Sequence, residues 1–531
     1  MNRMMILRAL LAGSALVGAS AAIAQTPPAE TPGTQAEDPN AAPDADDAAA
    51  DAAIAAAGTG DDAQAKIELL QAQVDALQSA LENVKSSMVK TAPSWKGAPL
   101  FEDKDAGWSF KPRGRIMYDV GFTSNPGDRI VTRNLGFNTR VRRLRLGAEG
   151  TIPGGFGYKF EMDYANSTVG FGDAIITYAP IGKPFSVSIG NHETFNGLEQ
   201  VSSSRFLSFL ERSQMNDAFI NTRRIGVSAG YTNKPGTFRL NAGLFAAHSI
   251  DGGFDNDGYI AAARTSFTPV VNGNQLHFGG NVQYRNFQSN NGATASNSVG
   301  APSTNQIARY RARPFSQSTD FRFVDTGNFA AKSDMIYGVE LGGVFKSLHV
   351  AGEAQYTKVN AYERGDTLPA GLSQFATATF LVPSGDPSFF SAYGEIGYYL
   401  TGETRGYKNG TWDRTKVLRP LSKGGSGALQ INARYDYLDL DSNKLKQGFT
   451  NNFLTGVSTT SNSLTRGGKQ TGYLASLIWI PEDYFRVLIN YAHAQIEGGP
   501  QAGVVKPAST KPLDQRKYSV DTVAARVQVD F

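Results

Sequence analysis

From Trp95 to the C-terminus the chain consists of stretches about ten residues long in which apolar and polar side chains alternate. In 158–164, for example, Tyr158, Phe160, Met162 and Tyr164 alternate with Lys159, Glu161 and Asp163. A period of two with one apolar face predicts β-strands that have one face in an apolar medium. We count about sixteen such segments, near residues 113–122, 138–150, 156–166, 171–180, 184–192, 222–232, 237–247, 257–268, 275–287, 334–345, 347–359, 388–401, 426–440, 470–480, 484–496 and 517–531.

The lengths of the connections separate a membrane barrel from a soluble sandwich. Joins after even-numbered strands are mostly short, at 153–155, 182–183, 234–236, 346–347 and 481–483, whereas joins after odd-numbered strands are mostly long, notably 193–221, 288–333, 360–387 and 441–469. Short turns on one side and long loops on the other are typical of outer-membrane barrels. One join, 402–425, is long where a short turn is expected, so either the strand register differs there or that turn is enlarged.

The two ends of the chain support export to an outer membrane. Arg3 and Arg8 precede an apolar stretch and an Ala22–Ala24 cleavage pattern, so residues 1–24 are predicted to be a signal peptide. Beyond it no run of about 20 apolar residues occurs, and the chain has no Cys, which excludes helical membrane spans, disulfides and thiolate sites. A final strand that stops at Phe531 resembles those of outer-membrane barrels, in which this residue is the assembly signal.

Between signal and barrel lie two further segments. Residues 25–63 are rich in Ala, Pro and acidic residues without any aromatic, which predicts a disordered linker. Residues 64–90 carry a heptad pattern that predicts a short coiled coil, with a lone amphipathic helix as the alternative: Ile67, Leu70, Val74, Leu77, Leu81, Val84 and Met88. The predicted fold is therefore all-β: a sixteen-stranded antiparallel transmembrane β-barrel over 95–531, preceded by this linker and helix.

Several motifs within 108–531 resemble the phosphate-selective porin O and P family. They are Arg142–Gly147, Gly157–Tyr164, Asn196–Glu199, Ser203–Arg205, Glu211–Ser213, Arg223–Val227 and, most specifically, Leu400–Tyr407. The resemblance implies a homotrimeric sixteen-stranded porin in the bacterial outer membrane, whose inward-folded loops narrow the pore and whose basic side chains guide anions. It also implies a coiled coil before the barrel, which we expect on the periplasmic side.

The charge balance indicates an anion preference but does not place it on the strands. Residues 95–531 hold 46 basic and 36 acidic side chains, and a pore with that excess attracts anions. Ten basic side chains predicted to face the lumen, eight of them assigned to the anion pathway, are nearly matched by nine acidic ones. The eight are Arg115, Arg143, Arg145, Lys159, Arg224, Arg239, Arg285 and Arg434, the other two Arg486 and Arg526, and the acidic ones Asp119, Glu149, Glu161, Asp163, Glu340, Glu353, Glu395, Asp436 and Asp530.

The connections carry the excess of positive charge. Arg309, Arg311 and Arg313 occupy alternate positions, so their guanidinium groups form either a ladder for phosphate or a surface that pairs with lipopolysaccharide phosphates. The join 402–425 is also strongly basic. Residues 201–213 are the better candidate for a constricting loop, with hydrogen-bond donors and charges at Ser203, Ser204, Arg205 and Arg212.

The sequence predicts a channel rather than an enzyme. The five His are scattered without metal-ligand or catalytic spacing, and no metal, cofactor or nucleic-acid site is indicated. We expect an anion-leaning diffusion pore for phosphate or related oxyanions, with outer-membrane lipid, lipopolysaccharide and the barrel assembly machinery as partners. A non-selective porin and a structural tether with little conductance are the alternatives.

Overall fold

The computed structural model of the 531-residue chain describes residues 60–91, 93–95, 97–127, 133–166, 168–219, 222–247, 250, 258–287, 307–362, 380–447, 449–452, 457–460 and 467–531. The chain divides into two compact units, Met1–Lys85 and Ser86–Phe531. The predicted signal peptide and most of the predicted linker lie outside the described residues.

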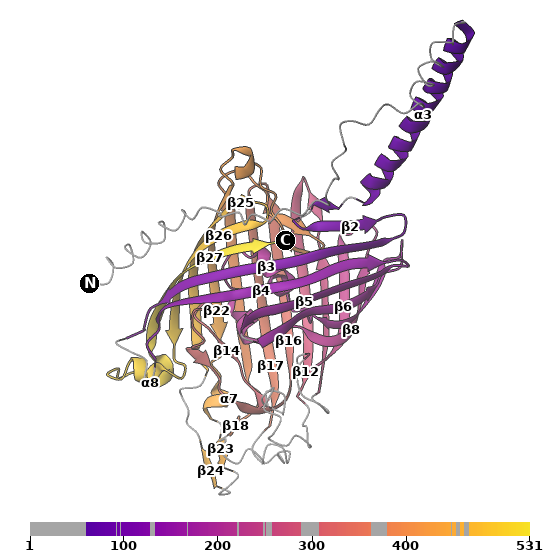
Figure 1. Cartoon of the computed structure of the whole chain (residues 1–531). Helices are drawn as coiled ribbons and strands as arrows, with labels where there is room; N and C mark the ends of the chain where they lie inside the picture. Colours follow the sequence, from indigo (N-terminus) through magenta and orange to yellow (C-terminus); the bar gives the residue numbers. More distant parts are fainter. Residues whose placement is uncertain are drawn as a thin grey trace, which may run out of the picture. The chain divides into compact units, whose positions relative to one another are not determined.

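Sixteen long strands of the second unit form a closed antiparallel barrel (Figure 1). The last strand pairs with the first, from Thr522 opposite Thr123 to Asp530 opposite Arg115, so the predicted barrel is confirmed. The strands are β3 (Trp108–Thr123), β4 (Gly136–Ile152), β5 (Phe156–Asn166), β6 (Thr168–Tyr178), β7 (Phe185–His192), β8 (Arg224–Thr232), β9 (Phe238–Ala246), β10 (Tyr259–Phe267), β12 (Asn274–Asn286), β16 (Phe329–Phe345), β17 (Leu348–Ala361), β19 (Ser388–Tyr399), β22 (Ala428–Asp439), β25 (Lys469–Glu482), β26 (Phe485–Glu497) and β27 (Lys517–Asp530).

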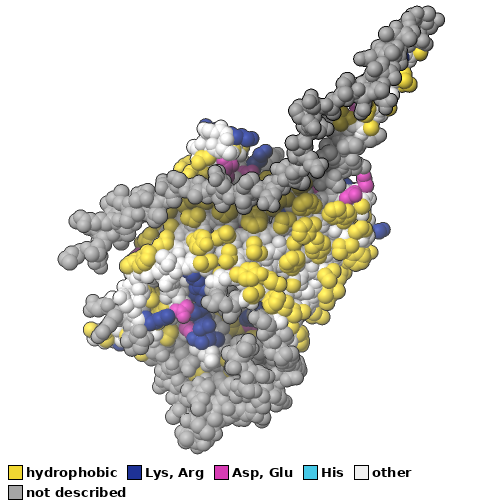
Figure 2. All heavy atoms as spheres, in the orientation of Figure 1, with side chains coloured by type: hydrophobic (Ala, Val, Ile, Leu, Met, Phe, Trp, Pro, Cys, Tyr) yellow, Lys and Arg dark blue, Asp and Glu magenta, His cyan; other side chains and the backbone are white. Residues whose placement is uncertain are grey.

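The alternation of side chains explains the two faces of the wall. Apolar side chains such as Ile176 and Leu244, each 63% exposed, lie on the outer face, where lipid replaces water. Figure 2 shows hydrophobic side chains spread over the face of the barrel on which Figure 1 labels β3–β6. Aromatic pairs lie at the ends of neighbouring strands beside the short turns, with Phe156 and Tyr178 4.8 Å apart between ring centroids. This position matches the aromatic girdle of a membrane barrel.

The C-terminal residue fits into a space that a glycine provides. The backbone N–H of Phe531 donates to Gly114 O at 3.0 Å, and Gly114 N–H donates to Phe531 O at 3.1 Å. A Cβ atom on Gly114 would lie 2.0 Å from the Phe531 ring. The ladder between the last and first strands therefore continues to the terminal residue, and its ring requires a glycine opposite.

Short strands and short helices lie in the connections and at the ends of the barrel strands. The short strands are β1 (Ser94–Trp95), β2 (Pro99–Asp103), β11 (Val270–Val271), β13 (Ile307–Ala308), β14 (Arg311–Ala312), β15 (Val324–Asp325), β18 (Phe380–Val382), β20 (Gly406–Lys408), β21 (Thr411–Asp413), β23 (Phe449–Asn452) and β24 (Val457–Thr460). The short helices are α4 (Leu198–Val201), η2 (Ser204–Phe206), α5 (Gln214–Ala218), η3 (Leu421–Lys423), α7 (Asn443–Lys446), α8 (Ala502–Val505) and η4 (Leu513–Gln515).

The one irregular join is an enlarged turn. β19 pairs directly with β22 in antiparallel register, so the strand count around residues 402–425 is right and the turn itself is long. It carries the β20–β21 hairpin, in which Gly406 pairs with Asp413.

The heptad segment is helical. Helix α3 (Gly60–Thr91) belongs largely to the first unit, and its heptad side chains from Ile67 to Leu81 are 48–70% exposed. The side chains of Val84 and Met88 lie outside those described. Among the described helices none is long and apolar enough to cross a membrane. The coiled coil remains a prediction.

Candidate pore constriction

The connection between β7 and β8, residues 193–223, folds into the barrel, and we call it the inner loop. Its helices α4 and α5 are very short, and apolar side chains from the helices and from the residues beside them form a packed core inside the barrel. Leu198, Phe209, Met215 and Phe219 are each at most 1% exposed. An apolar cluster of this kind within a lumen gives the loop a fixed position, because its exposure to water would cost free energy.

Two carboxylates of the wall hold the inner loop through its backbone. Glu353 on β17 accepts hydrogen bonds from the N–H groups of Leu198 and Glu199, both at 2.8 Å. Asp436 on β22 accepts from the N–H of Gln214 at 3.2 Å. These bonds satisfy backbone donors that the starts of short helices leave free, so the acidic side chains are used for anchoring.

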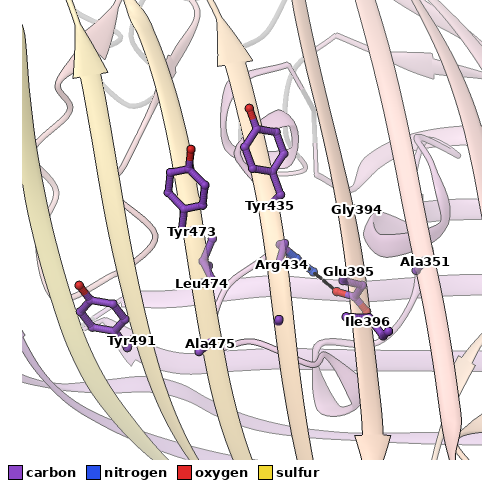
Figure 3. Close-up of a pocket in the computed structure, with 11 residues that line it drawn as sticks. Ala351, Gly394, Glu395, Ile396, Arg434, Tyr435, Tyr473, Leu474, Ala475 and Tyr491 are labelled. Atoms are coloured by element: carbon purple, nitrogen blue, oxygen red, sulfur yellow. Dashed lines mark hydrogen bonds and ion pairs between the residues drawn. The ribbon is translucent and has the colours of Figure 1, made fainter.

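Arg434 on β22 joins the inner loop to the wall. Its Nη2 lies 2.5 Å from both Glu199 of the loop and Glu395 of β19, and Figure 3 marks the pair with Glu395 by a dashed line. Its guanidinium also lies 4.5 Å from the ring centroids of Phe209 and Tyr393. Only 1% of the side chain is exposed. Arg434 is therefore enclosed between loop and wall.

The opposite edge of the inner loop is held by arginines of β4 and β27. Arg142 donates two hydrogen bonds to Glu211, at 2.7 and 2.9 Å, and Arg526 approaches the same carboxylate at 3.0 Å. Burial acts to raise the pKa of Glu211, but Arg142 and Arg526 outweigh it and hold the pKa well below the usual range. The Glu211 carboxylate therefore stays ionised and paired with these arginines in mildly acidic solution.

The predicted loop residues have different surroundings. Ser204 accepts a hydrogen bond from Arg115 at 2.7 Å, and Arg205 lies 3.3 Å from Asp530 and also donates to Ser203. The guanidinium of Arg212 donates to three carbonyl oxygens of the loop itself, those of Glu199, Gln200 and Ser202, at 2.8–3.2 Å. Arg212 thus stabilises the fold of the loop.

Residues 307–327 form a second inward segment. Arg309 pairs with Asp325 at 2.5 Å and Arg313 pairs with Asp217 of the inner loop at 2.9 Å. Arg311 forms no ion pair with a described residue. The Phe315 ring fills the space beside Gly472, where a Cβ atom would lie 2.0 Å away. Two of the three alternating arginines are therefore engaged in ion pairs.

The enlarged turn 402–425 enters the lumen from the side of the short turns. Arg405 lies 3.3 Å from Glu395 and donates to Phe206 O of the inner loop at 3.1 Å. At the hairpin tip, Gly410 O accepts from Arg264 on β10 at 3.2 Å. The lumen thus holds three inward-folded segments, which interact with one another and with the wall.

Comparison with known proteins identifies the family of this chain. Residues 110–531 match the family model described as phosphate-selective porin O and P. The chain belongs to this family. It is 33% identical to an uncharacterised protein of Caulobacter vibrioides over 84% of this chain and 78% of that protein. It is 26% identical to Porin O of Pseudomonas aeruginosa over 67% and 77%, respectively.

Among solved structures, the porin is similar to the outer membrane channel DcaP of Acinetobacter baumannii, with 14% identity and a TM-score of 0.44 over 81% of this chain and 99% of that chain. The family match, together with the closed barrel described above, makes this protein an outer-membrane porin.

The wall of the porin divides into two sectors of opposite charge. We call β26, β27 and β3–β9 the basic sector and β10–β22 the acidic sector, with β25 between them. In the basic sector the inward charges are Lys111, Arg113, Arg115, Arg140, Arg142, Arg143, Arg145, Lys159, Arg224, Arg239, Arg486 and Arg526 against Asp119, Glu149, Glu161, Asp163, Asp173 and Asp530. In the acidic sector, apart from the bulged Lys332, they are Arg264, Arg285 and Arg434 against Asp334, Glu340, Glu353, Glu395 and Asp436.

The two sectors differ in what covers them. In the acidic sector the side chains of Glu340 and Asp334 are fully buried. In the basic sector Lys159 keeps 32% and Asp163 20% of the side chain exposed. The inward-folded segments therefore cover the acidic sector and also β26, β27 and part of β3, where Arg526, Asp530 and Arg115 are buried, and they leave inward charges of β4 and β5 in contact with solvent.

Most of the predicted pathway cations have anionic or carbonyl partners. Arg145 pairs with Glu161 and Asp163, Lys159 with Asp173, and Arg285 with Asp334. Arg224 donates to Ala247 O at 2.9 Å, and Arg239 to Thr268 at 3.3 Å.

Arg143 differs from these cations. It forms no ion pair with a described residue, and its buried Nε has no hydrogen-bond partner there. The charges that act on it most strongly are those of Arg142, Arg145, Arg115 and Arg212. Arg143 is therefore a cation among cations, at a place where an anion would be stabilised.

Several lumen cations could not be assigned from the sequence. Arg142 reaches the lumen because a bulge sets Met117 opposite Arg143 and Tyr118 opposite Val141, so that Arg142 is an extra residue. Arg264 lies on a strand whose inward neighbours Ile260 and Ala262 are apolar, and this hides the alternation. No group of residues suited to hold a metal ion occurs in the described part of the chain.

Proposed function

We propose that this porin is an anion-leaning diffusion channel for phosphate or related small oxyanions. Its passage runs along the basic sector, past Arg143, Lys159 and Arg113. The observation that carries the proposal is the unequal covering of the two sectors, because the inward carboxylates of the acidic sector are all buried, whereas eight basic and only three acidic inward side chains of the basic sector stay partly exposed. A low-dielectric wall then focuses the field of those cations into the passage.

Arg143 is the residue that we assign to anion binding. Guanidinium groups offer forked N–H donors that match phosphate oxygens, and this one lacks a partner among the described residues. Arg311 has a similar role in the second segment, since its neighbours Arg309 and Arg313 are neutralised by Asp325 and Asp217. Arg434 and Arg212 position the inner loop instead of contacting the permeating ion.

The test is titration of phosphate into a chloride current through the purified porin in a planar bilayer. We expect phosphate to block the chloride current in a saturable manner. A current that phosphate leaves unchanged would refute the oxyanion site and leave a general porin, and the absence of any conductance would favour the structural tether.

We also propose that the porin is a homotrimer whose α3 helices associate on the periplasmic side. Five heptad side chains from Ile67 to Leu81 are exposed on the helix, and association would bury them. Chemical cross-linking of the full chain tests this proposal. Trimers should form, and Leu70→Asp with Leu77→Asp should reduce cross-links between the α3 helices of different chains. Unchanged cross-linking would leave α3 as a lone amphipathic helix.

A further inference from the structure

The β20–β21 hairpin, residues 406–413, spans the acidic half of the lumen. At its base Arg405 lies against His349 of β17 and 3.3 Å from Glu395 of β19. At its tip Asn409 accepts from Arg239 of β9 at 3.4 Å, and Gly410 O accepts from Arg264 of β10. The hairpin therefore reaches from β19 across to β9, under the wall strands between them.

The hairpin and the inner loop contact each other as two layers. The backbone N–H of Trp412 donates to Ser202 Oγ at 3.0 Å. Arg405 donates to Ser208 Oγ, and its guanidinium lies 4.2 Å from the Trp412 ring centroid. Trp412 itself is 3% exposed. This packing fixes the hairpin in the lumen with little room for water between the layers.

Two glutamates lie directly opposite each other in the wall that these layers cover. Glu340 on β16 and Glu353 on β17 are cross-strand partners. Like charges in that position destabilise a sheet unless each has its own partner. Glu353 has the inner-loop amides described above. Glu340 has Arg264, with Nη2 at 2.7 Å, and His277 at 3.0 Å.

The partners of Glu340 are in turn held by the hairpin. Arg264 donates to Gly410 O, and His277 Nδ1 forms a hydrogen bond with the Tyr407 hydroxyl at 2.5 Å. The hairpin thus covers Glu340 through the partners of this carboxylate, and the inner loop covers Glu353. Glu340 and Glu353 are only 1% and 4% exposed as a result.

From this arrangement we infer that the hairpin is the selectivity element of the pore: by covering Glu340 and holding its partners Arg264 and His277, it keeps the acidic sector from the permeating ions. This inference rests on the proposed anion preference. It gives the enlarged turn a function of its own, because a pore without the hairpin would present carboxylates as well as guanidinium groups to the solution.

The experiment replaces Gly406–Asp413 by Asn-Gly. Gly406 and Asp413 are paired across the hairpin, so a two-residue type I′ turn can connect their neighbours Arg405 and Arg414. The deleted segment contains one basic residue, Lys408, and one acidic residue, Asp413, so the net charge does not change. Any change in selectivity then reports uncovering and not loss of charge.

Relative to the wild-type porin measured in parallel, we expect a higher single-channel conductance. In a salt gradient, we also expect the reversal potential to shift toward the equilibrium potential of the cation. Unchanged selectivity, or higher conductance with the same anion preference, would overturn the inference. A wild-type pore without anion preference would instead refute the proposed function. Should the replacement not assemble, Trp412→Ala, which loosens the hairpin without shortening it, is expected to give a smaller shift in the same direction, and no shift would overturn the inference.

A cross-link tests the placement of the hairpin independently. A Cβ atom on Gly410 would lie 3.9 Å from Ser266 Cβ on β10, within the range of a disulfide. Because the chain has no Cys, Ser266→Cys with Gly410→Cys can form only this bond within one chain. Formation under oxidant in the folded porin is expected, with unaltered selectivity. Failure of the pair to form would show that the tip does not reach the wall and would overturn the inference.

Discussion

Substitution of Arg143 by Gln is the sharpest test of the anion site. The change removes one positive charge beside Arg142, Arg145 and Arg115 and breaks no ion pair with a described residue. For an anion about 5 Å away, the lost interaction is roughly 1 kcal/mol in water-like surroundings and about 3 kcal/mol at an effective dielectric constant of ~20. Because the passage is hydrated, we expect about 1–2 kcal/mol, which corresponds to a roughly 5- to 30-fold higher half-blocking concentration of phosphate.

The assay is the phosphate titration of chloride current, carried out in parallel on Lys183→Gln as a control. Lys183 is an exposed cation in the turn between β6 and β7 and lies outside the lumen. The control should leave the half-blocking concentration unchanged. The effect of Arg143→Gln should shrink in about 1 M salt, where the screening length is ~3 Å. Equal block in Arg143→Gln and wild type would refute the assignment of the site.

Three further substitutions have definite expected outcomes. Arg434→Gln leaves Glu199 and Glu395 without their shared cation, and breaking a buried pair costs about 3–5 kcal/mol. We therefore expect a loosened inner loop and a noisier open-channel current. Quiet recordings would contradict this role of Arg434. Arg311→Gln should weaken phosphate block more than Arg309→Gln, whose charge Asp325 already neutralises, and the reverse order would be inconsistent with the ion pairs described. Gly114→Val must displace the Phe531 ring, so a smaller heat-modifiable, folded fraction is expected on gels, and normal folding would show that the ring moves freely.

The sequence predicts the barrel well because the fold depends on a local property. A period of two marks most spanning strands, and the sixteen predicted segments correspond to the sixteen strands within five residues at each end. The failures are local as well. The bulge that turns Arg142 inward reverses the alternation within one strand, and the apolar neighbours Ile260 and Ala262 mask the orientation of Arg264.

The constriction is harder to predict because its contacts are distant in the chain. Residues 201–213 could be singled out as a constricting loop, and Arg434 could be placed on the inward face of its strand. That Arg434 is enclosed by Glu199, 235 residues away, and by Phe209 depends on how the loop packs, which no periodicity encodes. The same reason explains why the nearly matched wall charges predicted from the sequence, ten basic and nine acidic, concealed two sectors of opposite sign.

The central claim is that permeating ions meet the basic sector while the acidic sector is enclosed. The reversal potential of the wild-type porin in a potassium chloride gradient tests it most directly. The structure predicts a reversal potential displaced toward the equilibrium potential of chloride, with the displacement decreasing as salt screens the wall. A displacement toward the equilibrium potential of potassium would contradict the account.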